Sequence, residues 1–90
     1  MPARRLIVHG RVQGVFYRGW TVEQARALGL AGWVRNRSDG TVELIASGEA
    51  AAIDALIERL RQGPPAARVD RIDVADADEV SGPFEQRPTA

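Results

Sequence analysis

The chain has 90 residues, of which 44% are hydrophobic, and this is enough for one compact domain but not for a second core. Twelve arginines balance twelve acidic residues, so no overall field attracts nucleic acid or a membrane surface. The absence of cysteine excludes disulfides, a thiol nucleophile and a thiolate metal site. No apolar run reaches the ~20 residues that span a bilayer, and the N-terminus lacks a secretory pattern. We therefore expect one domain over residues 1–90, monomeric and located in the cytoplasm, with no membrane partner.

The first predicted element is a half-buried strand from Leu6 to Val12, because apolar or small residues occupy every second position. A helix is predicted from about Trp20 to Leu30, where apolar residues recur at helical spacing. Thr21 and Gln24 have the spacing of a capping box near its start. A strand followed by a helix is therefore expected in the first third of the chain.

An antiparallel hairpin follows in the prediction. Its strands are Gly32 to Arg37 and Thr41 to Ser47, and Ser38-Asp39-Gly40 supplies the turn residues. In the second strand the apolar residues share one face, as expected when only one side of a sheet is covered. A second helix is predicted to begin after Gly48-Glu49 and to end at Gly63-Pro64-Pro65. Its apolar stripe consists of Ala52, Ile53, Leu56, Ile57 and Leu60.

A fourth strand is predicted from Val69 to Val74, and the opposite parity of Val69 and Ile72 indicates a bulge. A polar loop follows, and Phe84 is expected to anchor a short final strand that Pro88 ends. The order strand, helix, strand, strand, helix, strand predicts an α+β, ferredoxin-like βαββαβ fold. Its sheet is expected to be antiparallel with two helices on one face, a fold that by itself indicates no activity.

The segment between the first strand and the first helix is the most informative for chemistry. It reads Gly10-Arg11-Val12-Gln13-Gly14-Val15-Phe16-Tyr17-Arg18. Successive backbone N–H groups in such a turn can converge on one point, and the helix dipole adds positive charge, so the segment suits a phosphate-sized anion. Arg18 at its end can bind two phosphate oxygens and stays charged. No Lys-Ser or Lys-Thr pair and no G-x-G pattern is present, which argues against a nucleotide site.

The run G-R-V-Q-G-V-F-Y-R resembles the phosphate-loop signature of acylphosphatases. Gly32-Trp33-Val34-Arg35-Asn36, followed by Asp39-Gly40, resembles the second signature of that family. The resemblance extends from about Leu6 to Val74 and implies the same fold that the pattern of elements predicts. Tyr17 stands where phenylalanine is more usual, a change that we expect to be harmless.

The resemblance implies hydrolysis of acyl phosphates to a carboxylate and inorganic phosphate, without a cofactor or metal. Arg18 would hold the phosphate and Asn36 would orient the attacking water. The amides of the loop would bind phosphate as well, and its residues are Gln13, Gly14, Val15, Phe16, Tyr17 and Arg18. An amide is enough for the role of Asn36, because a carboxylate leaves without a general acid and the main demands are position and charge stabilisation.

Other interpretations remain open at this stage. Asn36 can simply serve the turn that follows it, and the aromatic residues beside Arg18 can indicate an RNA-binding domain of similar fold. A catalytically idle acylphosphatase-like module, serving as a binding or regulatory unit, is the main alternative. Several residues are expected to have only structural or solvated roles. These are His9, Arg35, Arg37, the acidic residues from Asp70 to Glu79, Trp20 and Trp33.

Overall fold

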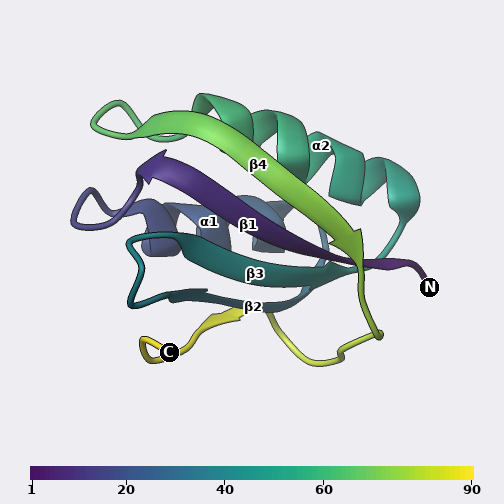
Figure 1. Cartoon of the computed structure of the whole chain (residues 1–90). Helices are drawn as coiled ribbons and strands as arrows, with labels where there is room; N and C mark the ends of the chain where they lie inside the picture. The colour runs from purple at the N-terminus through teal and green to yellow at the C-terminus, as the bar shows by residue number, and fades with distance from the viewer.

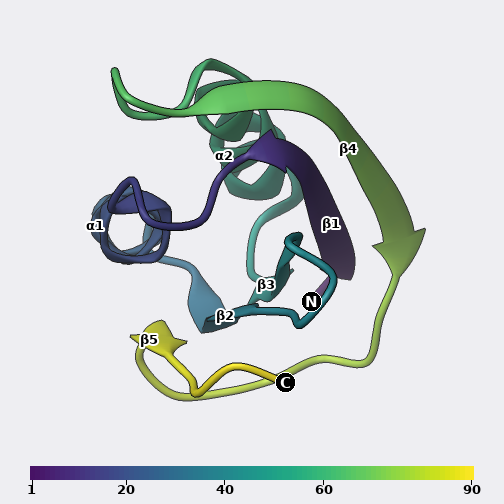
Figure 2. The same ribbon diagram turned by 60° about the vertical axis from the view of Figure 1, so that its left-hand side comes forward.

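The structure is a computed structural model that describes residues 1–90. Its elements in chain order are β1 (Ala3–Arg11), α1 (Tyr17–Ala27), β2 (Ala31–Asn36), β3 (Val42–Ser47), α2 (Ala50–Gln62), β4 (Arg68–Asp76) and β5 (Glu85–Gln86). One five-stranded sheet has the order β4-β1-β3-β2-β5. Both helices lie on the same face of it (Figure 1), and the turned view in Figure 2 shows the other face uncovered. This arrangement confirms the predicted two-layer ferredoxin-like fold.

The sheet is mixed, so the expectation of a purely antiparallel sheet is wrong at one edge. β1 pairs antiparallel with β3 and β4, and β2 pairs antiparallel with β3. β5 instead runs parallel to β2, with Trp33 opposite Glu85 and Val34 opposite Gln86. The cause is the loop after β4, which crosses from one edge of the sheet to the other and returns the chain in the direction of β2 (Figure 2).

The core lies between the sheet and the two helices. Alternate residues of the strands and the predicted stripe of α2 fill it, as expected for elements with one covered face. Ala52 and Ile57 lie at its margin. The residues that are buried there include Leu6, Val8, Val34, Val42, Leu44, Ala46, Ile53, Leu56, Leu60 and Phe84. The burial of Phe84 confirms that it anchors the final strand.

The predicted bulge is present between β1 and β4. His9 lies opposite Arg71, whereas the next residue, Gly10, lies opposite Val69. Asp70 is therefore the extra residue of β4, and it accounts for the opposite parity of the residues on either side of it. Gly10 is required there, because a Cβ atom would lie 2.1 Å from the carbonyl oxygen of Arg68.

The first helix begins and ends three residues earlier than predicted. It starts at Tyr17, and Thr21 lies fully buried inside it, so the predicted Thr21–Gln24 capping box is wrong. At its other end Gly29 adopts a φ of 71°. The N–H of Leu30 donates to the Ala25 carbonyl, which is typical of a Schellman C-cap. This cap ends the helix before Leu28.

The C-terminal segment continues along β2 beyond Pro88, so the expectation that Pro88 ends the pairing is wrong. The N–H of Arg87 donates to the Val34 carbonyl at 2.8 Å, and the N–H of Ala90 donates to the Asn36 carbonyl at 3.0 Å. Proline removes only its own donor, and the donors on either side of it still reach β2. The last residues therefore lie against the strand that ends at Asn36.

The uncovered face of the sheet carries a buried carboxylate. Glu43 on β3 is 5% exposed and bonds Arg5 at 2.6 Å and Arg35 at 2.7 Å. Burial raises its pKa, but the hydrogen bonds from the two guanidinium groups outweigh burial and hold the pKa below the usual value. Arg35 is therefore a half-buried partner, not the exposed residue that was expected. It also lies 4.8 Å from the ring of Trp33, which Arg87 flanks at 5.0 Å.

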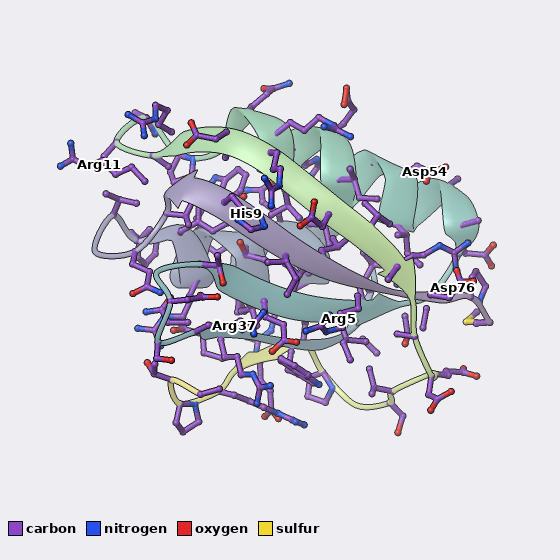
Figure 3. All side chains as sticks on the ribbon, viewed as in Figure 1. Arg5, His9, Arg11, Arg37, Asp54 and Asp76 are labelled. Atoms are coloured by element: carbon purple, nitrogen blue, oxygen red, sulfur yellow. The ribbon has the colours of Figure 1, made fainter.

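His9 lies on the same uncovered face (Figure 3). It was expected to be solvated, but its Nε2 is 2.9 Å from Asp73 Oδ2 and its side chain is only 28% exposed. The hydrogen bond to His9 holds the pKa of the Asp73 carboxyl below its usual range. His9 therefore takes part in a side-chain hydrogen bond between β1 and β4 on this face.

Candidate active site

Two left-handed residues shape the loop between β1 and α1. Gly14 has a φ of 73° and Phe16 a φ of 64°. Glycine adopts this conformation freely, but for phenylalanine it is unfavourable by about 1–3 kcal/mol. The chain thereby turns sharply enough for α1 to start at the next residue, Tyr17. Strained backbone of this kind is concentrated at functional sites, where the surrounding structure maintains it.

The N-terminus of α1 is left open to an anion. Its first backbone hydrogen bond runs from the N–H of Trp20 to the Phe16 carbonyl, so the N–H groups of Tyr17, Arg18 and Gly19 have no partner within the helix. No side chain caps this end, and its first turn contains no acidic residue. Free N–H groups together with the helix dipole form an anion-binding site.

Arg18 lies in this first turn, where a positive charge is unfavourable beside the helix dipole. Most other arginines of the chain make a side-chain bond, as Arg4 does with Asp76 and Arg71 with Asp73, whereas Arg11 and Arg37 share with Arg18 the lack of one. The half-buried Arg18 side chain makes no hydrogen bond or ion pair with any other residue of the chain. Its guanidinium therefore keeps all its donors for a ligand.

Gln13 ties the loop to the β2–β3 hairpin. Its Nε2 donates to the carbonyl oxygens of Arg37 at 2.8 Å and Thr41 at 2.9 Å. The turn between those two residues is held by Asp39, which accepts from the N–H and the Oγ1 of Thr41. The Thr41 side-chain hydrogen bond holds the pKa of Asp39 below its usual range. The loop and the hairpin therefore form one connected unit.

Asn36 ends β2 and shares its face with the core residue Val34, so its side chain lies on the side of the helices. Its Oδ1 is buried and has no hydrogen-bond partner. A buried acceptor without a donor costs about 1–3 kcal/mol, and native proteins usually provide a partner or a water. This oxygen is therefore suited to accept a hydrogen bond from a bound water.

A cavity of about 140 Å³ brings these parts together. Figure 1 shows that the loop after β1, the β2–β3 hairpin and the C-terminal segment lie at the same end of the sheet. The cavity is lined by Val12, Gly14, Phe16, Tyr17, Arg18, Gly19, Asn36 and Gln86. Five of the residues that the sequence predicted are therefore on its wall: Gly14, Phe16, Tyr17, Arg18 and Asn36.

Two predicted loop residues do not line the cavity, and three lining residues were not predicted. Gln13 turns its side chain toward the hairpin, and Val15 packs against the core. Val12 and Gly19 flank the predicted loop in the sequence, and a glycine in the first turn of a helix was the available signal for the latter. Gln86 comes from β5, and no sequence signal places it beside Asn36.

Tyr17 connects the site to the second helix. Its side chain is 1% exposed, and its hydroxyl donates to the Leu60 carbonyl at 2.8 Å. That carbonyl belongs to the last turn of α2, where no backbone N–H is available to it. Burial raises the pKa of Tyr17, so the hydroxyl stays neutral and keeps its proton for this bond. Trp20 packs beside it with ring centroids 5.6 Å apart.

No group of three or more His, Cys, Asp or Glu residues is arranged to hold a metal ion. The acidic residues of β4 instead pair with arginines: Asp70 with Arg68, Asp73 with Arg71, and Asp76 with Arg4. Neither helix is long and apolar enough to span a bilayer.

Comparison with known proteins identifies the family. The Acylphosphatase family model matches residues 4–85. An acylphosphatase of Rhizorhabdus wittichii is 57% identical over 97% of this chain and 89% of its own length, and one of Acidovorax sp. is 58% identical over 96% and 90%. The crystal structure of acylphosphatase from Bacillus subtilis superposes with a TM-score of 0.91 at 38% identity, covering 97% of this chain and 99% of that one. With the matched region spanning both the β1–α1 loop and the β2–β3 hairpin, this chain belongs to the acylphosphatase family.

Proposed function

We propose that the protein hydrolyses acyl phosphates by in-line attack of a water that Asn36 positions, while Arg18 and the loop amides hold the phosphoryl group. Membership of the acylphosphatase family supports the activity. The observation that carries the assignment of residues is the single cavity that Arg18 and Asn36 share. The substrate is a small-molecule acyl phosphate, and inorganic phosphate is one of its two products.

The geometry supports a division of roles between the two sides of the cavity. On one side, the open N-terminus of α1 and the unpaired guanidinium of Arg18 supply positive charge and N–H donors for the phosphoryl oxygens. On the other side, the unpartnered Oδ1 of Asn36 accepts a hydrogen bond from water. A carboxylate leaves readily, so placing water in line and stabilising charge on the phosphoryl group are sufficient.

Asn36 acts by position and not as a base, because a neutral amide accepts a hydrogen bond but does not take up a proton at ordinary pH. Its carbonyl group orients the water, and its amino group can donate to a phosphoryl oxygen. The proton released from water leaves with the phosphate product or to solvent. No covalent intermediate is required by this arrangement.

The test is release of phosphate from benzoyl phosphate by the wild type and by Asn36→Ala, in the presence of a chelator. We expect metal-independent turnover by the wild type and a loss of about 100-fold in kcat for the variant, with a smaller change in KM. Ser38→Ala is the matched control, because Ser38 is exposed in the same hairpin and its side chain makes no contact with the cavity.

Full activity of Asn36→Ala would contradict the role of Asn36. Absence of turnover by the folded wild type, together with stable binding of a partner, would support a regulatory module instead. A monomeric state, a cytoplasmic location and the absence of nucleic-acid binding remain predictions from the composition.

A further inference from the structure

An exposed aromatic ring stands at the wall of the proposed site. Phe16 is 67% exposed and lines the cavity beside Arg18. Two other apolar side chains, Val12 and Tyr17, contribute to the wall, but each is only 1% exposed because the core takes up its surface. Phe16 is therefore the one apolar side chain of the cavity wall with substantial exposed surface.

The position of this ring depends on two locally unfavourable features: a left-handed backbone at Phe16 and a glycine within the helix at position 19. The backbone of Phe16 is left-handed, with a φ of 64°. The ring lies over Gly19, where a Cβ atom would be 2.3 Å from Phe16 Cε1, so any larger residue at that position would displace it. Glycine is itself disfavoured within a helix. Glycine at position 16 would relieve the backbone strain, and without the ring an alanine would fit at position 19.

We propose that Phe16 is a specificity-determining residue that contacts the acyl group of the substrate and favours aromatic over small acyl groups. This inference rests on the proposed function, because it assumes that the phosphoryl group occupies the amides of the α1 N-terminus. The acyl group then extends from the phosphoryl group along the cavity wall toward solvent. An aromatic acyl group can cover the exposed ring, whereas an acetyl group is too small to do so.

The experiment compares kcat/KM for benzoyl phosphate and acetyl phosphate in the wild type and two variants. Phe16→Gly removes the ring and adopts the left-handed backbone without strain. Phe16→Leu keeps an apolar side chain without a ring. Val74→Ala is the control, because Val74 is also an exposed apolar residue but lies on β4, outside the cavity.

We expect Phe16→Gly to lower the ratio of kcat/KM for benzoyl phosphate over acetyl phosphate by about three- to ten-fold, as expected for one lost aromatic contact. Phe16→Leu should give an intermediate ratio, and Val74→Ala the wild-type ratio. The inhibition constants of benzylphosphonate and methylphosphonate provide a second measurement that needs no turnover, and their ratio should shift in the same direction.

An unchanged ratio in Phe16→Gly, with wild-type turnover of both substrates, would overturn this inference and leave the proposed function standing. Equal losses for both substrates would likewise show that Phe16 only shapes the loop. Failure of the folded wild type to hydrolyse either substrate would overturn the proposed function, and the role of Phe16 with it.

Discussion

The two hollows of this molecule lie at opposite ends of α1 and carry opposite charge. The hollow at the start of α1 is the smaller, at about 140 Å³, and contains Arg18. The hollow at the end of α1 measures about 260 Å³ and is lined by two carboxylate residues, Glu49 and Glu79, of which Glu79 pairs with the N-terminal ammonium of Met1 at 3.5 Å. In Figure 3, Arg11 marks the first end of the molecule and Asp76 the other.

The N-termini of the two helices explain why only one hollow suits an anion. Neither helix has a side-chain hydrogen bond at its N-cap. At α2 the N-cap residue is Glu49, whose negative charge complements the helix dipole. At α1 the N-cap is the strained Phe16, and Arg18 adds positive charge to the positive end of the dipole. The smaller hollow is therefore the one whose charge suits an anion, which supports the site proposed above.

The largest expected effect comes from removing that charge. Arg18→Ala should lower kcat/KM for benzoyl phosphate by about 10²- to 10³-fold and weaken inhibition by inorganic phosphate, because the phosphoryl group loses its charged donor. Glu79→Gln is the control in the acidic hollow and should leave both values unchanged. A similar loss in the two variants would contradict the conclusion that only the hollow with Arg18 binds the phosphoryl group.

A smaller loss of activity is expected when the hydrogen bonds between the β1–α1 loop and the β2–β3 hairpin are removed. Gln13→Leu removes the two hydrogen bonds to the Arg37 and Thr41 carbonyls, and Asn36 is then held less firmly opposite Arg18. We expect kcat to fall about ten-fold with a smaller change in KM, since a misplaced catalytic group mainly affects the chemical step. Gln24→Leu makes the same substitution at a residue outside the cavity, where it removes the hydrogen bond that Gln24 accepts from Arg59, and it should retain wild-type kcat. A change confined to KM would show that Gln13 serves phosphate binding alone.

The smallest expected effect concerns the bond that anchors the start of α1 to the end of α2. Tyr17→Phe keeps the ring and removes the hydroxyl that donates to the Leu60 carbonyl. The free energy of unfolding should fall by about 1 kcal/mol, measured by urea denaturation, because a buried acceptor loses its partner. Equal stability of the two proteins would confirm the expectation that tyrosine at this position is merely harmless.

Most of the fold could be predicted because the strands alternate apolar and polar residues and α2 has a clear stripe. Even the bulge at Asp70 was visible in the parity of Val69 and Ile72. The start of α1 was not, since Phe16 adopts a backbone conformation that phenylalanine rarely takes. The short final strand was expected, but its parallel direction was missed, because two residues carry no periodic signal and their place depends on the buried Phe84.

The candidate site was predictable where residues adjacent in sequence form it, and less so where it depends on tertiary contacts. Arg18 and Asn36 were named from two sequence signatures, and the structure places both on one cavity. The side-chain bonds of Gln13 cross from the loop to a hairpin more than twenty residues away. Gln86 reaches the cavity only through the pairing of β5 with β2. Contacts between residues so far apart in the chain leave no local pattern in the sequence from which they could be predicted.

The bulge in β4 also affects whether two copies of the chain can pair through the edge of the sheet. β4 is a nine-residue strand at the edge of the sheet, and such an edge can pair with the same edge of another copy and lead to aggregation. The extra residue Asp70 interrupts the regular spacing of its outer hydrogen-bonding groups. Charged side chains along the strand would also have to be brought close together in such a pairing. The bulge and these charges oppose edge-to-edge pairing of two copies, in line with the predicted monomer.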